Sequence, residues 1–210
     1  MKIIYTKDKE FKTEFENILK RAKSDIKGVS KIVENIIDEI VEDGNEALKR
    51  HIEKFDKWIV KSDDELLISQ KDMKKAYETL DESLKKSLHI AYERIKAYHE
   101  KQLPKSWIDF EENGTILGQK VTAVDKAGLY IPGGKAAYPS SLLMNAIPAK
   151  VAGVKEIVVC TPTPNNEVNE LLLAACHLCG VSKVYKVGGA SAIAAMAYGT
   201  QTIPKVDVIT

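Results

Sequence analysis

The sequence predicts an α/β fold in which a helical layer precedes an open, doubly wound, mainly parallel sheet of the Rossmann-like type. Two observations predict it. Up to about Leu103 the chain is rich in lysine and glutamate at helical spacing, and it contains only two glycines. After Asn113, short β-branched segments alternate with helical segments, which is typical of an α/β domain. The expected division is therefore a helical region over 1–112 and an α/β domain over 113–210.

Apolar spacing predicts the helices of the first region. Between Ser30 and Asp43, pairs of isoleucine and valine recur every four residues, which predicts an amphipathic helix. Ser30 is the expected N-cap, and Gly44 lies just past the end of this helix. Further helices are expected over 45–55, over 72–80 with a capping box of Ser69 and Asp72, and over 82–103.

The second region predicts parallel strands that are buried on both faces. Its strand segments are short and continuously β-branched rather than alternating, as expected where helices cover both faces of a sheet. Right-handed crossovers then give an open, doubly wound domain. The expected strands are 127–131, 156–161, 183–187 and 206–210, the expected helices are 140–152, 166–179 and 190–198, and short strands are also expected in the stretch 115–131.

Composition limits the classes of partner. Lysine and arginine nearly cancel the acidic residues, leaving a formal net charge of +1, so the balance favours neither nucleic acid nor an anionic membrane. No apolar run approaches the roughly 20 residues that span a bilayer. The cysteines lie in apolar surroundings and the N-terminus lacks the apolar region of a secretory signal, which favours a reducing cytoplasm. Small molecules or a second copy of the chain are the expected partners.

Two glycine pairs mark the candidate ligand site. In "YIPGG", Pro132 fixes the chain direction, while Gly133 and Gly134 permit positive φ or close approach of a ligand to the backbone. Gly188 and Gly189 precede a helix, so free N–H groups and the helix dipole would face an anionic group such as a pyrophosphate. Both pairs follow strands, where ligands of such sheets bind. They predict a dinucleotide cleft, although neither fits Gly-x-Gly-x-x-Gly.

Other polar residues are weighed against structural roles. Tyr130 ends a strand, which would place its ring at the mouth of the cleft, although most tyrosines of this kind pack in the core. The Cys-x-x-Cys spacing of Cys176 and Cys179 lies late in a helix without a second ligand pair, so burial is the favoured interpretation. No nucleophile set, paired catalytic carboxylates or zinc-ligand cluster is visible. Solvated surface or helix packing is expected for the histidines on charged helices: His51, His89 and His99.

The stretch "AGLYIPGGKAAYPSSLLMNAIPAKVAGVKEIVVCTPTP", followed by "VYKVGGASAIAAMAYGTQTIPKVDVI", resembles the first nucleotide-binding-type domain of the histidinol dehydrogenase family, whose fold is aldehyde-dehydrogenase-like. "IVENIIDEIVEDGNEALKRHIEKFD" is similar to that family's helical opening, so the resemblance covers essentially the whole chain. It implies a zinc-dependent homodimeric enzyme of histidine biosynthesis. Such an enzyme oxidises L-histidinol to L-histidine through an aldehyde, reducing two NAD molecules in turn.

The resemblance assigns few functional residues to this chain. Tyr130 matches a tyrosine that contacts NAD in the family. Ser191 stands where the family has a glutamine that also contacts NAD, and serine is too short to make the same amide hydrogen bonds directly. The family's zinc ligands, acid/base pair and most substrate contacts belong to a second domain, expected beyond Thr210. This chain is therefore expected to hold no catalytic or metal-binding residue, and to be an incomplete NAD-side part that is inactive alone.

Two alternatives remain open. The first is a stand-alone nucleotide-binding or interaction module derived from the same domain, which the serine at position 191 motivates. The second is another enzyme of the aldehyde-dehydrogenase-like group. That group uses a catalytic cysteine, and none of Cys160, Cys176 and Cys179 is expected on a ligand-facing loop.

Overall fold

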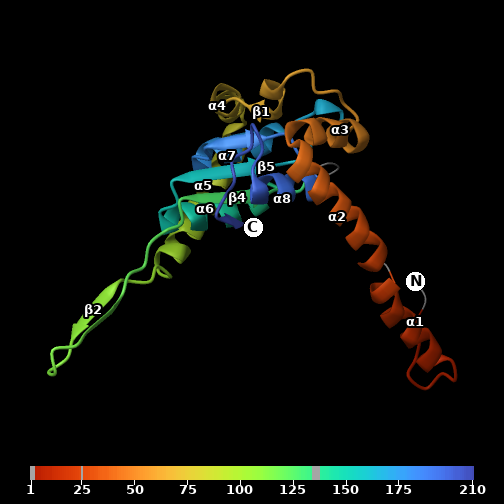
Figure 1. Cartoon of the computed structure of the whole chain (residues 1–210), viewed down its shortest axis with the longest axis horizontal. Coiled ribbons are helices and arrows are strands. Elements are labelled where there is room, and N and C mark those ends of the chain that lie inside the picture. The colour runs from red at the N-terminus through yellow and green to blue at the C-terminus, as the bar shows by residue number, and fades with distance from the viewer. Residues whose placement is uncertain (1–2, 25, 134–137) are drawn as a thin grey trace.

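The computed structural model describes residues 3–24, 26–133 and 138–210. Within these residues, a central sheet is covered by helices on both faces, and two arms extend away from this body (Figure 1). The strands of the sheet are β1 (Leu67–Ile68), β4 (Lys126–Tyr130), β5 (Glu156–Cys160), β6 (Lys183–Tyr185) and β7 (Val208–Ile209). The helices are α1 (Phe11–Ser24), α2 (Ile26–Asp43), α3 (Asn45–Asp56), α4 (Gln70–Thr79), α5 (Glu82–Glu100), α6 (Pro139–Ala152), α7 (Glu170–Cys179) and α8 (Gly189–Tyr198), with short 3₁₀ turns η1 (Asp63–Leu66) and η2 (Pro164–Asn166).

The sheet confirms the predicted parallel core. Its strand order is β1-β6-β5-β4-β7, and β4 pairs in parallel with both β5 and β7. β6 continues the parallel set beyond β5. β1 was not predicted: it is a two-residue strand that pairs antiparallel with β6, joining Leu67 to Tyr185. A strand this short carries no readable period in the sequence.

Two apolar layers lie on opposite faces of the sheet. Leu129, Ile157 and Val159 pack in one layer with residues of α4 to α7, whereas Val158 and Cys160 pack in the other with residues of α2, α3 and α8. The connections through α6 and α7 therefore cover one face, and the connection through α8 covers the other. The strand order accordingly reverses direction at β4, which gives the doubly wound arrangement and a switch point between β4 and β7.

Most predicted elements are confirmed, with shifts at their ends. Ser69 caps α4 as predicted: the Asp72 N–H donates to Ser69 Oγ over 3.1 Å, and the Ser69 hydroxyl donates to Asp72 Oδ2 over 2.6 Å. The N-cap expected at Ser30 is wrong: α2 begins at Ile26, and Ser30 lies inside it. Gly28 does not stop the helix, since a single glycine in a helix costs only about 1 kcal/mol relative to alanine.

The hairpin of β2 (Trp107–Phe110) and β3 (Ile116–Gln119) forms one of the two arms (Figure 1). β3 falls within a stretch expected to contain strands, but β2 was not predicted. Every residue of both strands is exposed, so neither strand has the one-sided apolar pattern that burial against a core imposes. α1 and the N-terminal part of α2 form the other arm. The domain boundary between residues 112 and 113 stays a prediction.

None of the helices in the described ranges combines the length and the apolar character that crossing a membrane requires.

Candidate functional site

The three loops that follow β4, β5 and β6 pack closely against one another at the carboxyl ends of these strands. A Cβ added to Gly133, after β4, would lie 2.7 Å from the carbonyl oxygen of Pro162, which follows β5. A Cβ added to Gly188, after β6, would lie 2.5 Å from Pro162 Cβ. Both positions therefore require glycine because the loop of Pro162 fills the space of a side chain. Pro132 is exposed beside Gly133, and the predicted site residue Gly134 lies outside the described residues.

Gly189 differs from these glycines because the space that a side chain would fill is empty of described atoms. It has a positive φ of 62°, and no described atom lies within 4 Å of a Cβ added there. Its N–H donates to the Tyr130 hydroxyl over 3.1 Å, which joins the end of β4 to the start of α8. The structure thus brings Tyr130 and the second glycine pair together, and one of the N–H groups expected to face an anion has a protein partner.

A cavity of about 260 Å³ adjoins this helix start, lined by residues of α2, α3 and α8 and by Pro162. Ile36, Ile52 and Phe55 give it apolar walls. Its titratable or hydroxyl side chains come from His51 and Asp56 on α3 and from Ser191 on α8. The site therefore combines an apolar enclosure with a small number of polar groups, as small-molecule pockets do.

His51 connects two of these elements through its ring. Its Nδ1 lies 2.9 Å from Ser191 Oγ, and its Nε2 lies 2.9 Å from Glu39 Oε2 on α2. His51 is buried, so of the two readings the sequence allowed, helix packing applies and solvated surface does not. Ser191 is only 3 % exposed. Glu39 was not predicted as a site residue, since an acidic residue on a charged helix carries no local signal.

Asp56 is a buried carboxylate in the same cavity. Its Oδ2 accepts a hydrogen bond from the Thr163 N–H at 3.2 Å. Burial raises the pKa of Asp56, and the hydrogen bond from Thr163 opposes this rise. Asp56 was not singled out from the sequence, because its position as the last residue of α3 is equally typical of a solvated helix end.

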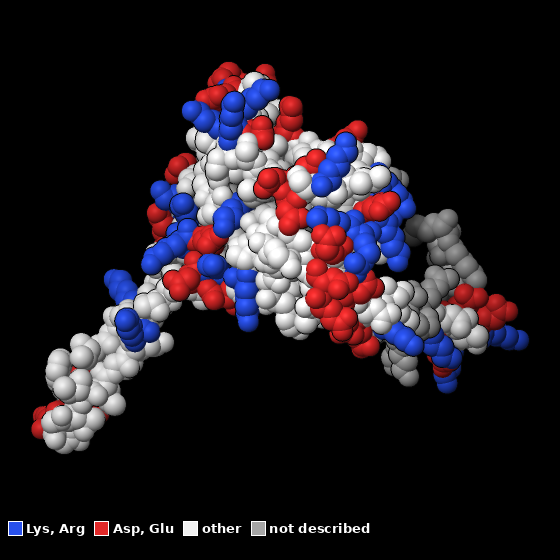
Figure 2. Space-filling model, turned by 45° about the horizontal axis from the view of Figure 1, so that its top comes forward, with Lys and Arg blue, Asp and Glu red and all other residues white. Residues whose placement is uncertain are grey.

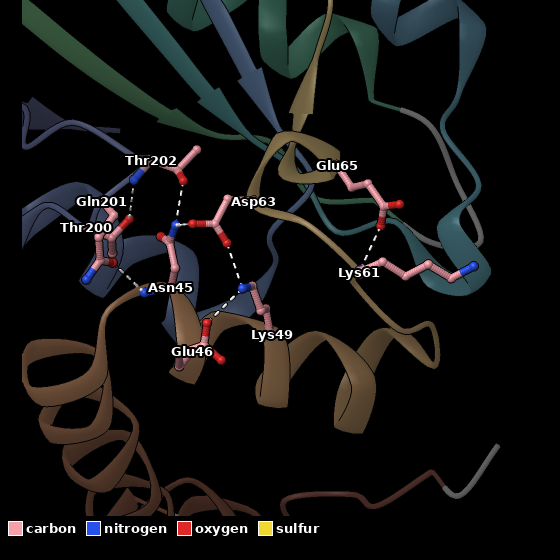
Figure 3. Close-up of polar contacts among 9 residues, drawn as sticks. All are labelled: Asn45, Glu46, Lys49, Lys61, Asp63, Glu65, Thr200, Gln201 and Thr202. Atoms are coloured by element: carbon pink, nitrogen blue, oxygen red, sulfur yellow. Dashed lines mark hydrogen bonds and ion pairs between the residues drawn. The ribbon is translucent and has the colours of Figure 1, made fainter.

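A polar cluster holds α3 against the sheet domain (Figure 3). The Asn45 N–H donates to Gln201 Oε1 over 2.8 Å. The Asn45 side-chain amide donates to Asp63 Oδ2 over 2.7 Å and to Thr202 Oγ1 over 2.5 Å. Lys49 completes the cluster with an ion pair of 2.7 Å to Asp63. These bonds fix the start of α3 to the loop after α8, and so fix His51 and Asp56 relative to the start of α8.

The cysteines take no part in this site. Cys160 lies in β5 while Cys176 and Cys179 lie in α7, and all are free and buried. Burial raises the pKa of Cys179 to about 12, so it is a protonated thiol at neutral pH. Among the described residues, no three or more His, Cys, Asp or Glu side chains are grouped to hold a metal ion.

A doubly wound sheet with glycine-bearing loops gathered at the carboxyl ends of its strands defines a Rossmann-like α/β protein. The family model of histidinol dehydrogenase matches residues 19–210. The chain belongs to the histidinol dehydrogenase family.

Individual relatives support this assignment. The chain is 71% identical over 205 residues to a histidinol dehydrogenase of Sulfurimonas denitrificans, covering 98% of this chain and 48% of that protein. It is 62% identical over 210 residues to one of Helicobacter hepaticus, covering 100% and 48%. The crystal structure of histidinol dehydrogenase from Elizabethkingia anophelis superposes with a TM-score of 0.80 at 31% identity, covering 86% of this chain and 41% of that chain. The chain spans about half the length of the curated relatives it matches.

Proposed function

We propose that this chain supplies the NAD-binding side of a histidinol dehydrogenase of histidine biosynthesis. The proposed enzyme oxidises L-histidinol to L-histidine through an aldehyde with two NAD molecules, depends on zinc, and acts as a homodimer in the cytoplasm. The observation that carries the proposal is the hydrogen bond between Tyr130 and Gly189 at the start of α8, beside a largely apolar cavity.

The residues present fit NAD. The open side of Gly189 lets a ligand approach the backbone, and the positive end of α8 favours a phosphate group. The cavity beside it is lined by the apolar side chains of Ile36, Ile52 and Phe55, which suit a heterocyclic ring. NAD would supply the hydride acceptor of the reaction. Tyr130 holds the helix start in place, and so orients whatever binds there.

Metal and proton-transfer chemistry are proposed for the enzyme as a whole rather than for these residues. The family resemblance assigns the zinc ligands and the acid/base pair to a second domain. Among the described residues, no group of three or more potential ligands is placed to hold zinc. The proposal therefore expects NAD binding by this chain without histidinol oxidation.

The hairpin supports the proposed homodimer. Trp107, Ile108 and Phe110 of β2 are each more than half exposed, and Ile116 and Leu117 of β3 are exposed as well. The hairpin surface carries few charged side chains between its base and its tip (Figure 2). Exposed apolar patches of this kind mark interaction sites. A second copy of the chain is the partner that the family resemblance implies.

Calorimetric titration of the chain with NAD, together with an assay of histidinol-dependent NADH formation with added zinc, tests the proposal. We expect binding without turnover, and Tyr130→Phe should weaken binding by about two- to tenfold by removing one hydrogen bond. Tyr98→Phe, at an exposed position on α5, is the matched control. A folded chain that does not bind NAD would contradict the proposal. Binding by this chain without restored turnover when the rest of a family enzyme is supplied would favour a stand-alone module.

A further inference from the structure

Glu39, His51 and Ser191 form a chain of two hydrogen bonds. The chemistry of the Glu39 carboxylate determines which atom donates in each bond. A carboxylate accepts hydrogen bonds and donates none. The hydrogen bond with His51 lowers the pKa of Glu39, so the charged carboxylate is the form present at neutral pH. His51 Nε2 therefore carries the proton and donates to Glu39 Oε2 across 2.9 Å.

The position of the proton on His51 determines which atom accepts the hydrogen bond from the Ser191 hydroxyl. A neutral imidazole carries a hydrogen on only one ring nitrogen, and in that form of His51 the acceptor is Nδ1. The Ser191 hydroxyl then donates to Nδ1 over the observed 2.9 Å. The hydroxyl has only one hydrogen, so the groups left for a ligand are the two lone pairs of its oxygen. Toward the cavity, Ser191 is therefore only an acceptor.

Asp56, a second polar side chain of the cavity, is also a hydrogen-bond acceptor. Asp56 uses Oδ2 to accept from the Thr163 N–H, and in its ionised form it has no proton to donate. The surrounding walls of Ile36, Ile52 and Phe55 offer no hydrogen bonds. A ligand carbonyl or carboxylate placed against the side chains of Ser191 and Asp56 would meet only acceptors, and its lost solvation would not be replaced there, because the N–H donors that line this cavity belong to the backbone at the start of α8.

We propose that Glu39 and His51 are positioning residues that fix the Ser191 hydroxyl as an acceptor, so that the cavity selects a flat heterocycle by its amino or carboxamide N–H. The inference rests on the dinucleotide binding proposed above and adds which ring chemistry the cavity accepts. Both halves of NAD carry such a group, the adenine amino group and the nicotinamide carboxamide. The binding experiment distinguishes these two sources.

Two ligand pairs test the selection in the 210-residue chain. AMP and purine riboside monophosphate differ in an amino group or a hydrogen at one ring position, whereas nicotinamide mononucleotide and nicotinic acid mononucleotide differ in a carboxamide or carboxylate. All ligands and variants are titrated at the same alkaline pH. We expect the N–H-bearing member of one pair to bind about tenfold more tightly, and that pair identifies the half of NAD held in the cavity.

Variants of Ser191 and Glu39 show whether these residues set the ligand preference or only stabilise the fold. Ser191→Ala removes the hydroxyl in an alanine-rich helix and should reduce the ratio of affinities to about one. Glu39→Gln can donate to Nε2 and so permits the other tautomer, which should lower or invert the ratio. Glu42→Gln, exposed on the same helix, should leave it unchanged. A merely structural role would weaken both members of a pair equally and leave their ratio intact.

The outcomes distinguish this inference from the function on which it rests. NAD binding by the wild-type chain without discrimination in either pair overturns the inference alone. An unchanged ratio in Ser191→Ala, with circular dichroism showing a folded chain, also overturns it. Absence of NAD binding by the folded wild-type chain overturns the proposed function, and the inference with it.

Discussion

At the scale of single residues, Pro162 decides which side chains its neighbours can carry. Gly188→Ala would place a Cβ 2.5 Å from Pro162 Cβ and 3.1 Å from Pro162 Cα. Because backbone and ring must move, we expect the free energy of unfolding to fall by about 1–3 kcal/mol in urea titrations. Gly28→Ala, in an exposed and open position of α2, should instead raise it by about 0.5–1 kcal/mol. Equal effects of the two substitutions would contradict the interlocked loops.

Asp56 gives a pH dependence of definite sign. Burial raises its pKa above the ordinary 3.8, so just above that pH the folded chain binds more protons than the unfolded chain. The free energy of unfolding therefore falls as the pH rises through this window, until the folded pKa is passed. Asp56→Asn removes this titration, so its free energy of unfolding should fall less as the pH rises above about 4. Asp38→Asn, exposed on α2, should keep the wild-type slope. Identical slopes for Asp56→Asn and wild type would contradict the assignment.

At the scale of elements, α3 depends on its first residue. Asn45→Ala removes the amide that donates to both Asp63 and Thr202. The two acceptors lose a partner in a partly buried place, so we expect a loss of about 1–3 kcal/mol in the free energy of unfolding. Glu53→Ala, exposed on the same helix, should change it by less than about 0.5 kcal/mol. Weaker NAD binding by Asn45→Ala than by Glu53→Ala, compared by calorimetry, would further support the role of α3 in the cavity.

At the scale of the whole molecule, the exposed hairpin is the surface proposed to contact a second copy of the chain. Ile108 and Phe110, 63% and 69% exposed, are alternate residues of β2 and so share one face. Replacing both with lysine should shift the chain from dimer to monomer in size-exclusion chromatography with light scattering. Glu93→Lys, exposed on α5, controls for added positive charge and should leave the dimer intact. A wild-type chain that is monomeric throughout would contradict the proposed interface.

Sequence patterns predicted the elements that the core determines. The strands and helices from β4 to β7 have short β-branched or apolar segments separated by glycine and proline, and their order is confirmed. β1 and β2 escaped prediction because one has two residues and the other packs against no core. Of the candidate site, the glycine positions and Tyr130 could be located from their places at strand ends. Their role as cofactor contacts stays a prediction.

The polar side of the cavity could not be predicted from local patterns. His51 and Ser191 are 140 positions apart, and only the tertiary fold brings their side chains together. Likewise, no local pattern indicates that Pro162 contacts Gly133 and Gly188, which come from two other loops. Long-range contacts of this kind leave no period in the sequence.

The bond between Asn45 and Gln201 also bears on how the chain folds. These residues are 156 positions apart, so the first turn of α3 lacks this partner until the segment near residue 200 has been synthesised. Closing so long a loop is entropically slow, and the cavity is therefore expected among the last features to form. Until then the apolar side chains of Ile36 and Ile52 lack the α8 side of their enclosure. Pulsed hydrogen exchange during refolding should find α3 protected later than α6 and α7. The growing chain would thus depend most on chaperones during the interval before α8 emerges.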